Sequence, residues 1–243
     1  METVEFFGIP VLAARRREDL LFAAAELIGK GGVIATVNPY NLALAREDVH
    51  LRIALRHSLN IPDGRGVATA ARLMGVRCAV YPGVELGEAL LDIKVVRLAV
   101  IGGKDGVAER ALLALSECHS NVTPVLAASG FGIREGAYID MIRVSQPDVV
   151  FICTGTPRQE LFARKAYAAY PNALYITLGG SADIYSKEKA RAPLFVRRIG
   201  MEWAWRCAVE RQRFPRLLRS LSFFRCLFEA RRGASDRKSA KNH

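Results

Sequence analysis

The sequence lacks the short motifs that mark several common classes of nucleotide- and metal-dependent protein. It contains no G-x-G-x-x-G, no G-x-x-x-x-G-K-[ST] and no G-x-S-x-G, which argues against a dinucleotide fingerprint, a P-loop and an α/β-hydrolase nucleophile. No two aspartates lie two positions apart, so the D-x-D pair that often holds a divalent metal under a nucleotide diphosphate is missing. We therefore expect no metal and no cofactor, and basic side chains must neutralise any bound diphosphate.

Cysteines and histidines are few, and neither follows a ligand pattern. The five cysteines include no C-x-x-C pair and the four histidines have no metal-ligand spacing, which favours a reducing compartment and buried structural roles. No apolar run approaches the roughly 18 residues that a membrane span needs. The first residues, "METVEFFGIPVLAARRRED", place acids before any apolar stretch, so we expect no signal peptide.

The positive charge is unevenly distributed along the chain. Residues 1–190 carry 21 basic and 20 acidic side chains, a net charge of +1, whereas residues 191–243 carry 14 basic and 4 acidic side chains, a net charge of +10. A nearly neutral body with a basic end is typical of proteins that meet a polyanion. Nucleic acid, an anionic membrane and a phosphorylated substrate all fit at this point.

Strand-like and helix-like patterns alternate along the first 190 residues. Near-continuous β-branched and apolar runs, which predict strands buried on both faces, occur at 31–38, 95–103, 122–130, 147–157 and 173–180. Helical patterns such as "DGVAERALLALSEC" separate them. This alternation predicts an α/β fold with a parallel, doubly wound sheet, and the last residues, "GASDRKSAKNH", read as a polar, disordered tail.

The predicted strands end in "TVN", "PDG", "IGG", "ASG", "TGTP" and "LGG". Ligands of open α/β sheets bind beyond the carboxyl ends of the strands, where backbone N–H groups and short polar side chains suit phosphates. Gly102, Gly103 and Gly180 are candidates for such contacts, although the same glycines serve ordinary turns. Thr156 and Asp183 can contact the ligand or cap the helices that they open.

Five segments appear in an order that resembles the WecG/TagA/CpsF family of bacterial glycosyltransferases. They are "TVN" (36–38), "IPDGRGV" (61–67), "GTPRQE" (155–160), "GGSADIYSKEKARAP" (179–193) and "GMEWAWRCAVERQRFPR" (200–216). The resemblance runs from about residue 5 to residue 228. It implies a Rossmann-like catalytic domain with helices on both faces of the sheet over residues 1–193, and a basic, amphipathic helical appendage over 194–232. The remaining residues, 233–243, are the predicted tail.

The resemblance also implies an activity and its residues. The expected reaction moves a sugar from a UDP-sugar to a saccharide on undecaprenyl diphosphate, in polysaccharide biosynthesis at the cytoplasmic face of the membrane. Asp63 is then the base, and Thr36, Asn38 and Gln159 line the same pocket. The appendage arginines that are expected to close over the diphosphate are Arg206, Arg213 and Arg216. Thr156, Gly180 and Asp183 are also expected to bind the substrate.

The residue types support this chemistry independently. One carboxylate is enough for an inverting displacement because UDP is a good leaving group, and a base need only take the proton of the acceptor hydroxyl. Pro62 and Gly64 flank Asp63 and can hold it rigidly, although aspartate is also an ordinary turn residue. The appendage arginines follow one another at spacings of seven and three, which on one continuous helix places them on one side. Pro215 is expected to break this helix, so that Arg216 starts a second segment.

The segment 215–232 combines arginines with a stripe formed by Leu217, Leu221, Phe224 and Phe228. A basic amphipathic helix favours an anionic membrane surface; packing on the body or on a second subunit is the alternative. Two other functions remain open from the residues, an NAD(P)-dependent oxidoreductase and a nucleic-acid-binding protein. The missing fingerprint opposes the first, and the absence of interleaved aromatics opposes the second, so we expect no nucleic-acid partner.

Three positions depart from the family pattern. Lys187 stands where members often have glycine, Glu85 replaces an aspartate in "PGVEL", and Glu210 precedes an arginine where a Glu-Pro pair is common. These departures bear on the donor sugar and the acceptor rather than on the class of reaction. The sequence names neither of them, nor the number of subunits.

Overall fold

The structure is a computed structural model that describes residues 2–198, 202–210 and 214–239. Its strands are β1 (Thr3–Phe6), β2 (Ile9–Leu12), β3 (Gly32–Val37), β4 (Leu59–Pro62), β5 (Val96–Gly102), β6 (Val122–Ala128), β7 (Val149–Cys153) and β8 (Leu174–Thr177). Its helices are α1 (Arg17–Ala25), α2 (Pro39–Glu47), α3 (Val49–Arg56), α4 (Arg65–Leu73), α5 (Gly83–Leu91), α6 (Val107–Cys118), α7 (Glu135–Ser145), α8 (Arg158–Ala169), α9 (Ser181–Tyr185), α10 (Leu194–Arg198), α11 (Glu202–Val209) and α12 (Phe214–Ser239).

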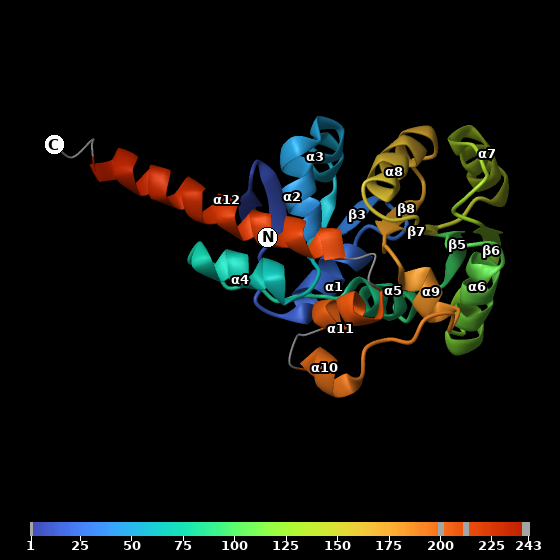
Figure 1. Cartoon of the computed structure of the whole chain (residues 1–243). Coiled ribbons are helices and arrows are strands. Elements are labelled where there is room, and N and C mark those ends of the chain that lie inside the picture. Colours follow the sequence, from blue (N-terminus) through green and yellow to red (C-terminus); the bar gives the residue numbers. More distant parts are fainter. Residues whose placement is uncertain (1, 199–201, 211–213, 240–243) are drawn as a thin grey trace.

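Six strands form one parallel sheet in the order β4-β3-β8-β7-β5-β6. Alternate side chains of the central strands enter different hydrophobic clusters, as the predicted double burial requires. Ile34 and Phe151 face a cluster with α1, α5, α6 and α9, whereas Val33 and Ile152 face one with α7 and α8. Helices therefore cover both faces (Figure 1), and the predicted Rossmann-like α/β class is confirmed.

At the middle of the sheet, neighbouring strands lead into helices on opposite faces. β7 leads into α8 on one face, whereas β8, its neighbour, leads into α9 on the other. β3, on the far side of β8, leads into α2, which packs on the same face as α8. Such divergence marks the place, beyond the carboxyl ends of the strands, where ligands of this architecture bind.

A second lobe that the sequence patterns did not predict is built around an N-terminal hairpin. β1 and β2 pair antiparallel, and their inward side chains share a cluster with α2, α3, α4 and α12. Phe223 of α12 is the centre of this contact, because its ring lies 5.7 Å from that of Phe6 and 5.8 Å from that of Phe7. The first and last elements of the chain are therefore joined.

The appendage is helical, as expected, but its packing differs from the predicted stripe. The buried side chains of α12 are Phe223 and Leu227, one or two positions away from Leu221 and Phe228, which are 57% and 49% exposed. Pro215 lies in the first turn of α12, where proline fits a helix. α12 continues to Ser239, so the helix includes residues 233–239 of the expected tail. Among the described residues, no helix has the length and hydropathy for crossing a bilayer.

Candidate active site

Four loops converge at the carboxyl edge of the sheet. β4, β3, β8 and β7 are consecutive neighbours, so Asp63, Asn38, Leu178 and Thr154, which directly follow these strands, lie along one edge. Backbone bonds fix this edge: the N–H of Asp63 donates to the carbonyl of Val37 at 2.7 Å. The structure thus brings together the loops that carry Asp63, Asn38, Thr156 and Gln159.

Asp63 is half-buried at the end of the edge strand β4. Pro62 still belongs to the strand, and its carbonyl accepts a hydrogen bond from the N–H of Tyr81 at 2.8 Å. Gly64 follows with a φ of 82° and opens α4, a conformation that residues with a side chain rarely adopt. The Pro-Asp-Gly sequence therefore holds the backbone of Asp63 on both sides.

Thr36 lies within β3, whereas Asn38 follows the strand and directly precedes α2. Thr36 is buried, and its hydroxyl donates to the carbonyl of Thr177 at 2.7 Å, which ties β3 to β8. Asn38 is the N-cap of α2: its Oδ1 accepts hydrogen bonds from the N–H groups of Tyr40 and Asn41 at 3.0 and 3.2 Å. Both therefore have a structural role beside any contact with a ligand.

A buried network of neutral amides and one carboxyl joins three of the loops. Glu160 Oε1 accepts hydrogen bonds from Thr156 Oγ1 at 2.8 Å, Gln159 Nε2 at 2.9 Å and Asn41 Nδ2 at 3.2 Å. Asn41 Nδ2 also reaches Thr156 Oγ1 at 2.6 Å. Gln159 Oε1 in turn accepts from the N–H of Gly179 at 2.9 Å, so the loops after β3, β7 and β8 form one unit.

Glu160 has an unusual environment within this network. Its side chain is 2% exposed, and its Oε2 has no hydrogen-bond partner among the described residues. Burial raises the pKa of the Glu160 carboxyl, against the hydrogen bonds from Gln159 and Thr156 that favour the charged form. Sequence reasoning missed Glu160 and Asn41; the motif "GTPRQE" contains the former, but only the fold shows which groups face it.

The glycine candidates are explained first by packing. A Cβ on Gly102 would lie 2.5 Å from the backbone of Cys153 in β7, and one on Gly103 would lie 2.5 Å from the side chain of Val107 in α6, so packing at the end of β5 requires both glycines. Gly180 is the N-cap of α9. Asp183, in the first turn of α9, forms an ion pair with Lys189 at 2.7 Å, which is a partner that the sequence did not reveal.

Arg206 and Arg216 lie on different helices, as expected, although Pro215 lies within the first turn of the second helix rather than at the break. Arg206 lies on α11, which ends at Val209, and Arg216 lies on α12; the side chain of Arg206 and the whole of Arg213 lie outside the described residues. Arg216 is placed 5.6 Å above the ring of Tyr40. Since Tyr40 follows the N-cap of α2, α12 brings one arginine to the rim of the site.

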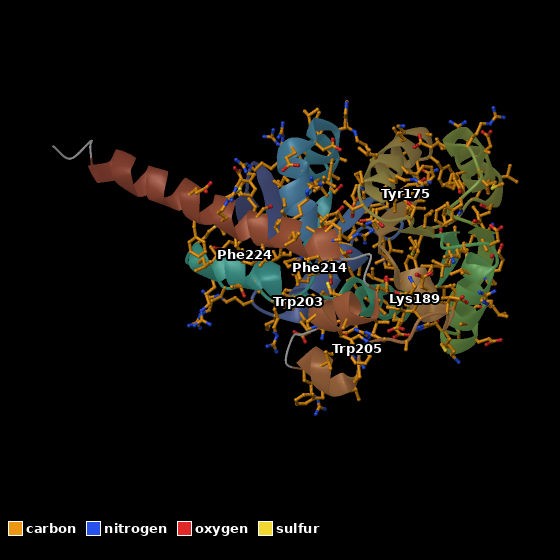
Figure 2. All side chains as sticks on the ribbon, in the orientation of Figure 1. Tyr175, Lys189, Trp203, Trp205, Phe214 and Phe224 are labelled. Atoms are coloured by element: carbon orange, nitrogen blue, oxygen red, sulfur yellow. The ribbon has the colours of Figure 1, made fainter. Side chains whose placement is uncertain are left out.

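Further contacts fasten the appendage to the body. Lys189, which Figure 2 shows beside α9, has its Nζ 3.7 Å from a carboxylate oxygen of Glu210, the residue after α11. Because Lys189 also pairs with Asp183 of α9, it links α11 to α9. Glu85 on α5 binds Arg17 and Arg191, each at 2.5 Å, and lies 3.8 Å from Arg197 of α10. Burial raises the pKa of the Glu85 carboxyl, but the hydrogen bonds from Arg17 and Arg191 outweigh it, so the net pKa is lowered.

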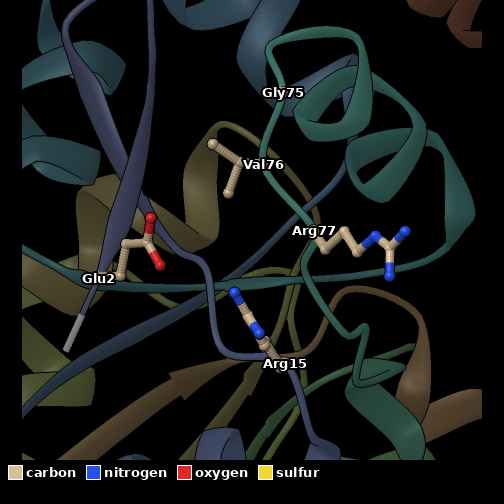
Figure 3. Close-up of a pocket in the computed structure, with 5 residues that line it drawn as sticks. All are labelled: Glu2, Arg15, Gly75, Val76 and Arg77. Carbon is tan, nitrogen blue, oxygen red and sulfur yellow. The ribbon is translucent and has the colours of Figure 1, made fainter.

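Two hollows lie beside α4. Figure 3 shows the smaller one, which is lined by Glu2, Arg15, Gly75, Val76 and Arg77. The larger one, of about 470 Å³, is lined by Arg65, Ala68, Thr69, Arg72, Arg77 and Cys78. Among the residues that the structure describes, no three His, Cys, Asp or Glu side chains are grouped as metal ligands.

These features define a Rossmann-like α/β protein with a candidate ligand site at the carboxyl edge of the sheet and a basic appendage beside it. A model of the "Glycosyl transferase WecG/TagA/CpsF family" matches residues 4–237. The chain therefore belongs to the WecG/TagA/CpsF family and is a glycosyltransferase, and the resemblance read from the five motifs is confirmed. Neither the oxidoreductase nor the nucleic-acid-binding alternative is needed.

Several relatives carry the same name, N-acetylglucosaminyldiphosphoundecaprenol N-acetyl-beta-D-mannosaminyltransferase. The protein from Bacillus subtilis (strain 168) is 29% identical over 225 residues, which cover 90% of this chain and 88% of the relative. That from Bacillus spizizenii (strain ATCC 23059 / NRRL B-14472 / W23) is 28% identical, with coverages of 88% and 83%. That from Staphylococcus aureus (strain NCTC 8325 / PS 47) is 27% identical, with coverages of 76% and 74%.

Proposed function

We propose that this glycosyltransferase moves a sugar, with inversion and without a metal ion, from a UDP-sugar to a saccharide carried on undecaprenyl diphosphate. The product is an intermediate of a surface polysaccharide or exopolysaccharide. The observation that carries the proposal is the position of Asp63: it is held by Pro62 and Gly64 at the carboxyl edge, next to the loop of Asn38, in a chain that matches the family over residues 4–237.

The relatives narrow the choice of substrates. Their name describes transfer of N-acetylmannosamine in β-linkage to N-acetylglucosaminyl-diphosphoundecaprenol. A β-linked product from an α-linked nucleotide donor is an inversion, which needs one base and no covalent intermediate. UDP-N-acetylmannosamine is therefore the first donor to test, and an undecaprenyl-diphosphate N-acetylglucosamine analogue is the first acceptor.

In the proposed reaction Asp63 accepts the proton of the acceptor hydroxyl while the hydroxyl oxygen attacks C1 of the donor sugar. The bond between C1 and the UDP oxygen breaks, and UDP leaves with the electron pair. Arg216, with Arg206 and Arg213 near it in sequence, is the group that we assign to the charge on the leaving diphosphate. The network around Glu160 holds Thr156 and Gln159 in place at the carboxyl edge of the sheet.

The proposed acceptor also gives a reason for the appendage. Trp203, Trp205 and Phe214 are 52%, 37% and 57% exposed on α11 and at the start of α12 (Figure 2). Apolar side chains on a basic segment suit a membrane–water interface. We propose that the protein acts as a peripheral protein on the cytoplasmic face of the membrane, docked through residues 215–232, where Leu218, Leu221 and Phe228 are exposed, and through these three aromatic side chains.

The decisive experiment measures UDP release from a panel of UDP-sugars with a short-chain lipid-diphosphate-sugar acceptor. Asp63→Asn should reduce turnover by about 10²–10⁴-fold, the usual effect of losing a general base, while UDP-sugar binding persists. Asp140→Asn, an exposed carboxylate on α7, is the matched control and should be as active as the wild type. Near-normal turnover of Asp63→Asn would refute the assignment of the base.

A further inference from the structure

The segment between Asp63 and Glu85 is a local exception to the neutral charge of the body. Residues 64–84 contain three arginines and no acidic residue. The three arginines, Arg65, Arg72 and Arg77, all line the hollow of about 470 Å³ beside α4. Its remaining lining residues are small or neutral, so the hollow has a strongly positive rim and room for a ligand.

Two of these arginines are available for a ligand. Arg72 and Arg77 are exposed and form no ion pair with any described residue. Arg65 instead donates a hydrogen bond to the carbonyl of Arg198 at 2.5 Å, which holds the end of α10 against the start of α4. Two unpaired guanidinium groups at one hollow favour an anion with several oxygens, such as a diphosphate.

The hollow begins at the catalytic loop. Arg65 is two residues after Asp63, and Arg65 and Arg72 are seven residues apart on α4, which is about 10 Å along the helix axis. Ala68 and Thr69 lie between them on the same side of α4, since positions three and four apart share a face. The end of the hollow that Arg65 lines is therefore only two residues along the chain from Asp63.

The two substrates are expected to bind on different sides of the reacting carbon. An inverting reaction places the attacking hydroxyl and the leaving diphosphate on opposite sides of C1. We place the UDP-sugar at Thr156 and Gly180, which follow β7 and β8, whereas β4 is the edge strand at the opposite end of this group of loops. The acceptor is thus expected on the β4 and α4 side.

The hollow also lies next to the surface assigned to the membrane. Val67 and Ala71 of α4 share one hydrophobic cluster with Phe223 and Leu227 of α12, and both helices extend to the same side of the molecule (Figure 1). Met74, after the last turn of α4, is exposed. A lipid that reaches this hollow can keep its hydrocarbon chain along the exposed apolar face of α12.

We propose that the arginine-lined hollow beside α4 binds the diphosphate of the lipid-linked acceptor, with Arg72 and Arg77 as the principal contacts. The inference rests on the proposed function, since it assigns one part of that substrate to one part of the surface. It separates two diphosphates: the appendage binds that of the donor, and α4 binds that of the acceptor.

Steady-state kinetics with UDP-N-acetylmannosamine and a short-chain acceptor test the assignment. Arg72→Gln combined with Arg77→Gln should raise KM for the acceptor by about tenfold or more, leave KM for the UDP-sugar unchanged and change kcat at saturating acceptor by less than about twofold. The control pair, Arg56→Gln with Arg164→Gln, removes the same charge from exposed positions on α3 and α8 and should match the wild type.

Three kinetic outcomes would overturn the proposal. An equal rise in KM for the acceptor in the control pair would mean that total charge, and not the hollow, determines acceptor binding. An equal rise in KM for the UDP-sugar would assign the hollow to the donor. Weaker binding to phosphatidylglycerol vesicles with an unchanged KM for the short-chain acceptor would assign the arginines to bulk phospholipid.

A binding measurement separates this inference from the proposed reaction. With the donor site filled by saturating UDP, farnesyl diphosphate should bind the wild type in a calorimetric titration, and the Arg72→Gln/Arg77→Gln variant should bind it about tenfold more weakly or worse, while farnesol should not bind. Equal affinity in both proteins refutes the site. If the protein binds farnesyl diphosphate through these arginines but transfers no sugar, the site is supported and only the proposed reaction is refuted.

Discussion

Replacing Glu160 by glutamine is expected to remove a pH-dependent loss of stability from the protein. The carboxyl is 2% exposed, its hydrogen-bonding neighbours Asn41, Thr156 and Gln159 are all neutral, and burial raises its pKa above the ordinary value of 4.5. Because the unfolded chain ionises first as the pH rises, the folded state must either keep the proton or bury a charge. Both alternatives cost free energy relative to the unfolded state.

The sign and size of the effect follow from linkage. The stability contributed by the protonated carboxyl is fully present below about pH 4.5, and it is lost as the pH rises from there towards the raised pKa of the folded state. One proton corresponds to about 1.4 kcal/mol of unfolding free energy for each pH unit in this window. Glu160→Gln cannot titrate, so the difference between the two proteins should change with that slope.

Urea unfolding measured every half unit from pH 4.5 to 8 gives the two stability curves. Only the slope of their difference is interpreted, because the amide nitrogen of the substituted side chain would take the place of the unpartnered Oε2 and add a constant cost of about 1–3 kcal/mol. The control, Glu117→Gln, changes an exposed carboxylate on α6, and its curve should run parallel to that of the wild type. If the Glu160→Gln curve also runs parallel, Glu160 is ionised throughout and the argument from burial is wrong.

Two further predictions concern the metal and the appendage. Activity in excess EDTA should equal activity in Mg²⁺, because basic side chains take the place of a metal; activity that EDTA abolishes and Mn²⁺ restores would contradict this. Leu218→Asp combined with Leu221→Asp, on the exposed side of α12, should release the protein from phosphatidylglycerol vesicles without lowering Tm. Phe223→Ala, on the buried side, should instead destabilise the protein by about 3–5 kcal/mol; the reverse pattern would show that the two sides were misassigned.

The sheet could be predicted from the sequence because its strands carry their own signal. The run at 95–103 is apolar and continuous, and the structure has β5 at Val96–Gly102. The hairpin of β1 and β2 had no comparable signal, since each strand has four residues and its partners include α12, more than 200 residues later. Contacts of that separation are decided by tertiary packing, which local patterns do not contain.

The same limit applies to the appendage. The stripe of Leu221 and Phe228 and the neighbouring stripe of Phe223 and Leu227 are both apolar at helical spacing, and a difference of one or two positions decides which of them faces the body. Phe6 and Phe7 determine which side packs, because their rings contact the ring of Phe223. The amphipathic pattern predicted a helix with an apolar side correctly, but it could not identify the side that packs.

Two departures from the family pattern show what kind of information a single sequence holds. At Lys187, where family members often have glycine, the backbone has a φ of 61°, so the position keeps the left-handed conformation that explains the usual glycine, and it does so at a cost of about 1–2 kcal/mol. A glycine in the family pattern reflects the backbone angle of a single residue, so its cause is local. Glu85 is different, because its partners Arg17 and Arg191 are 68 and 106 residues away. The longer side chain of glutamate lets one carboxylate join α1, α5 and the segment that leads into α10, so its meaning depends on the whole fold and not on the motif around it.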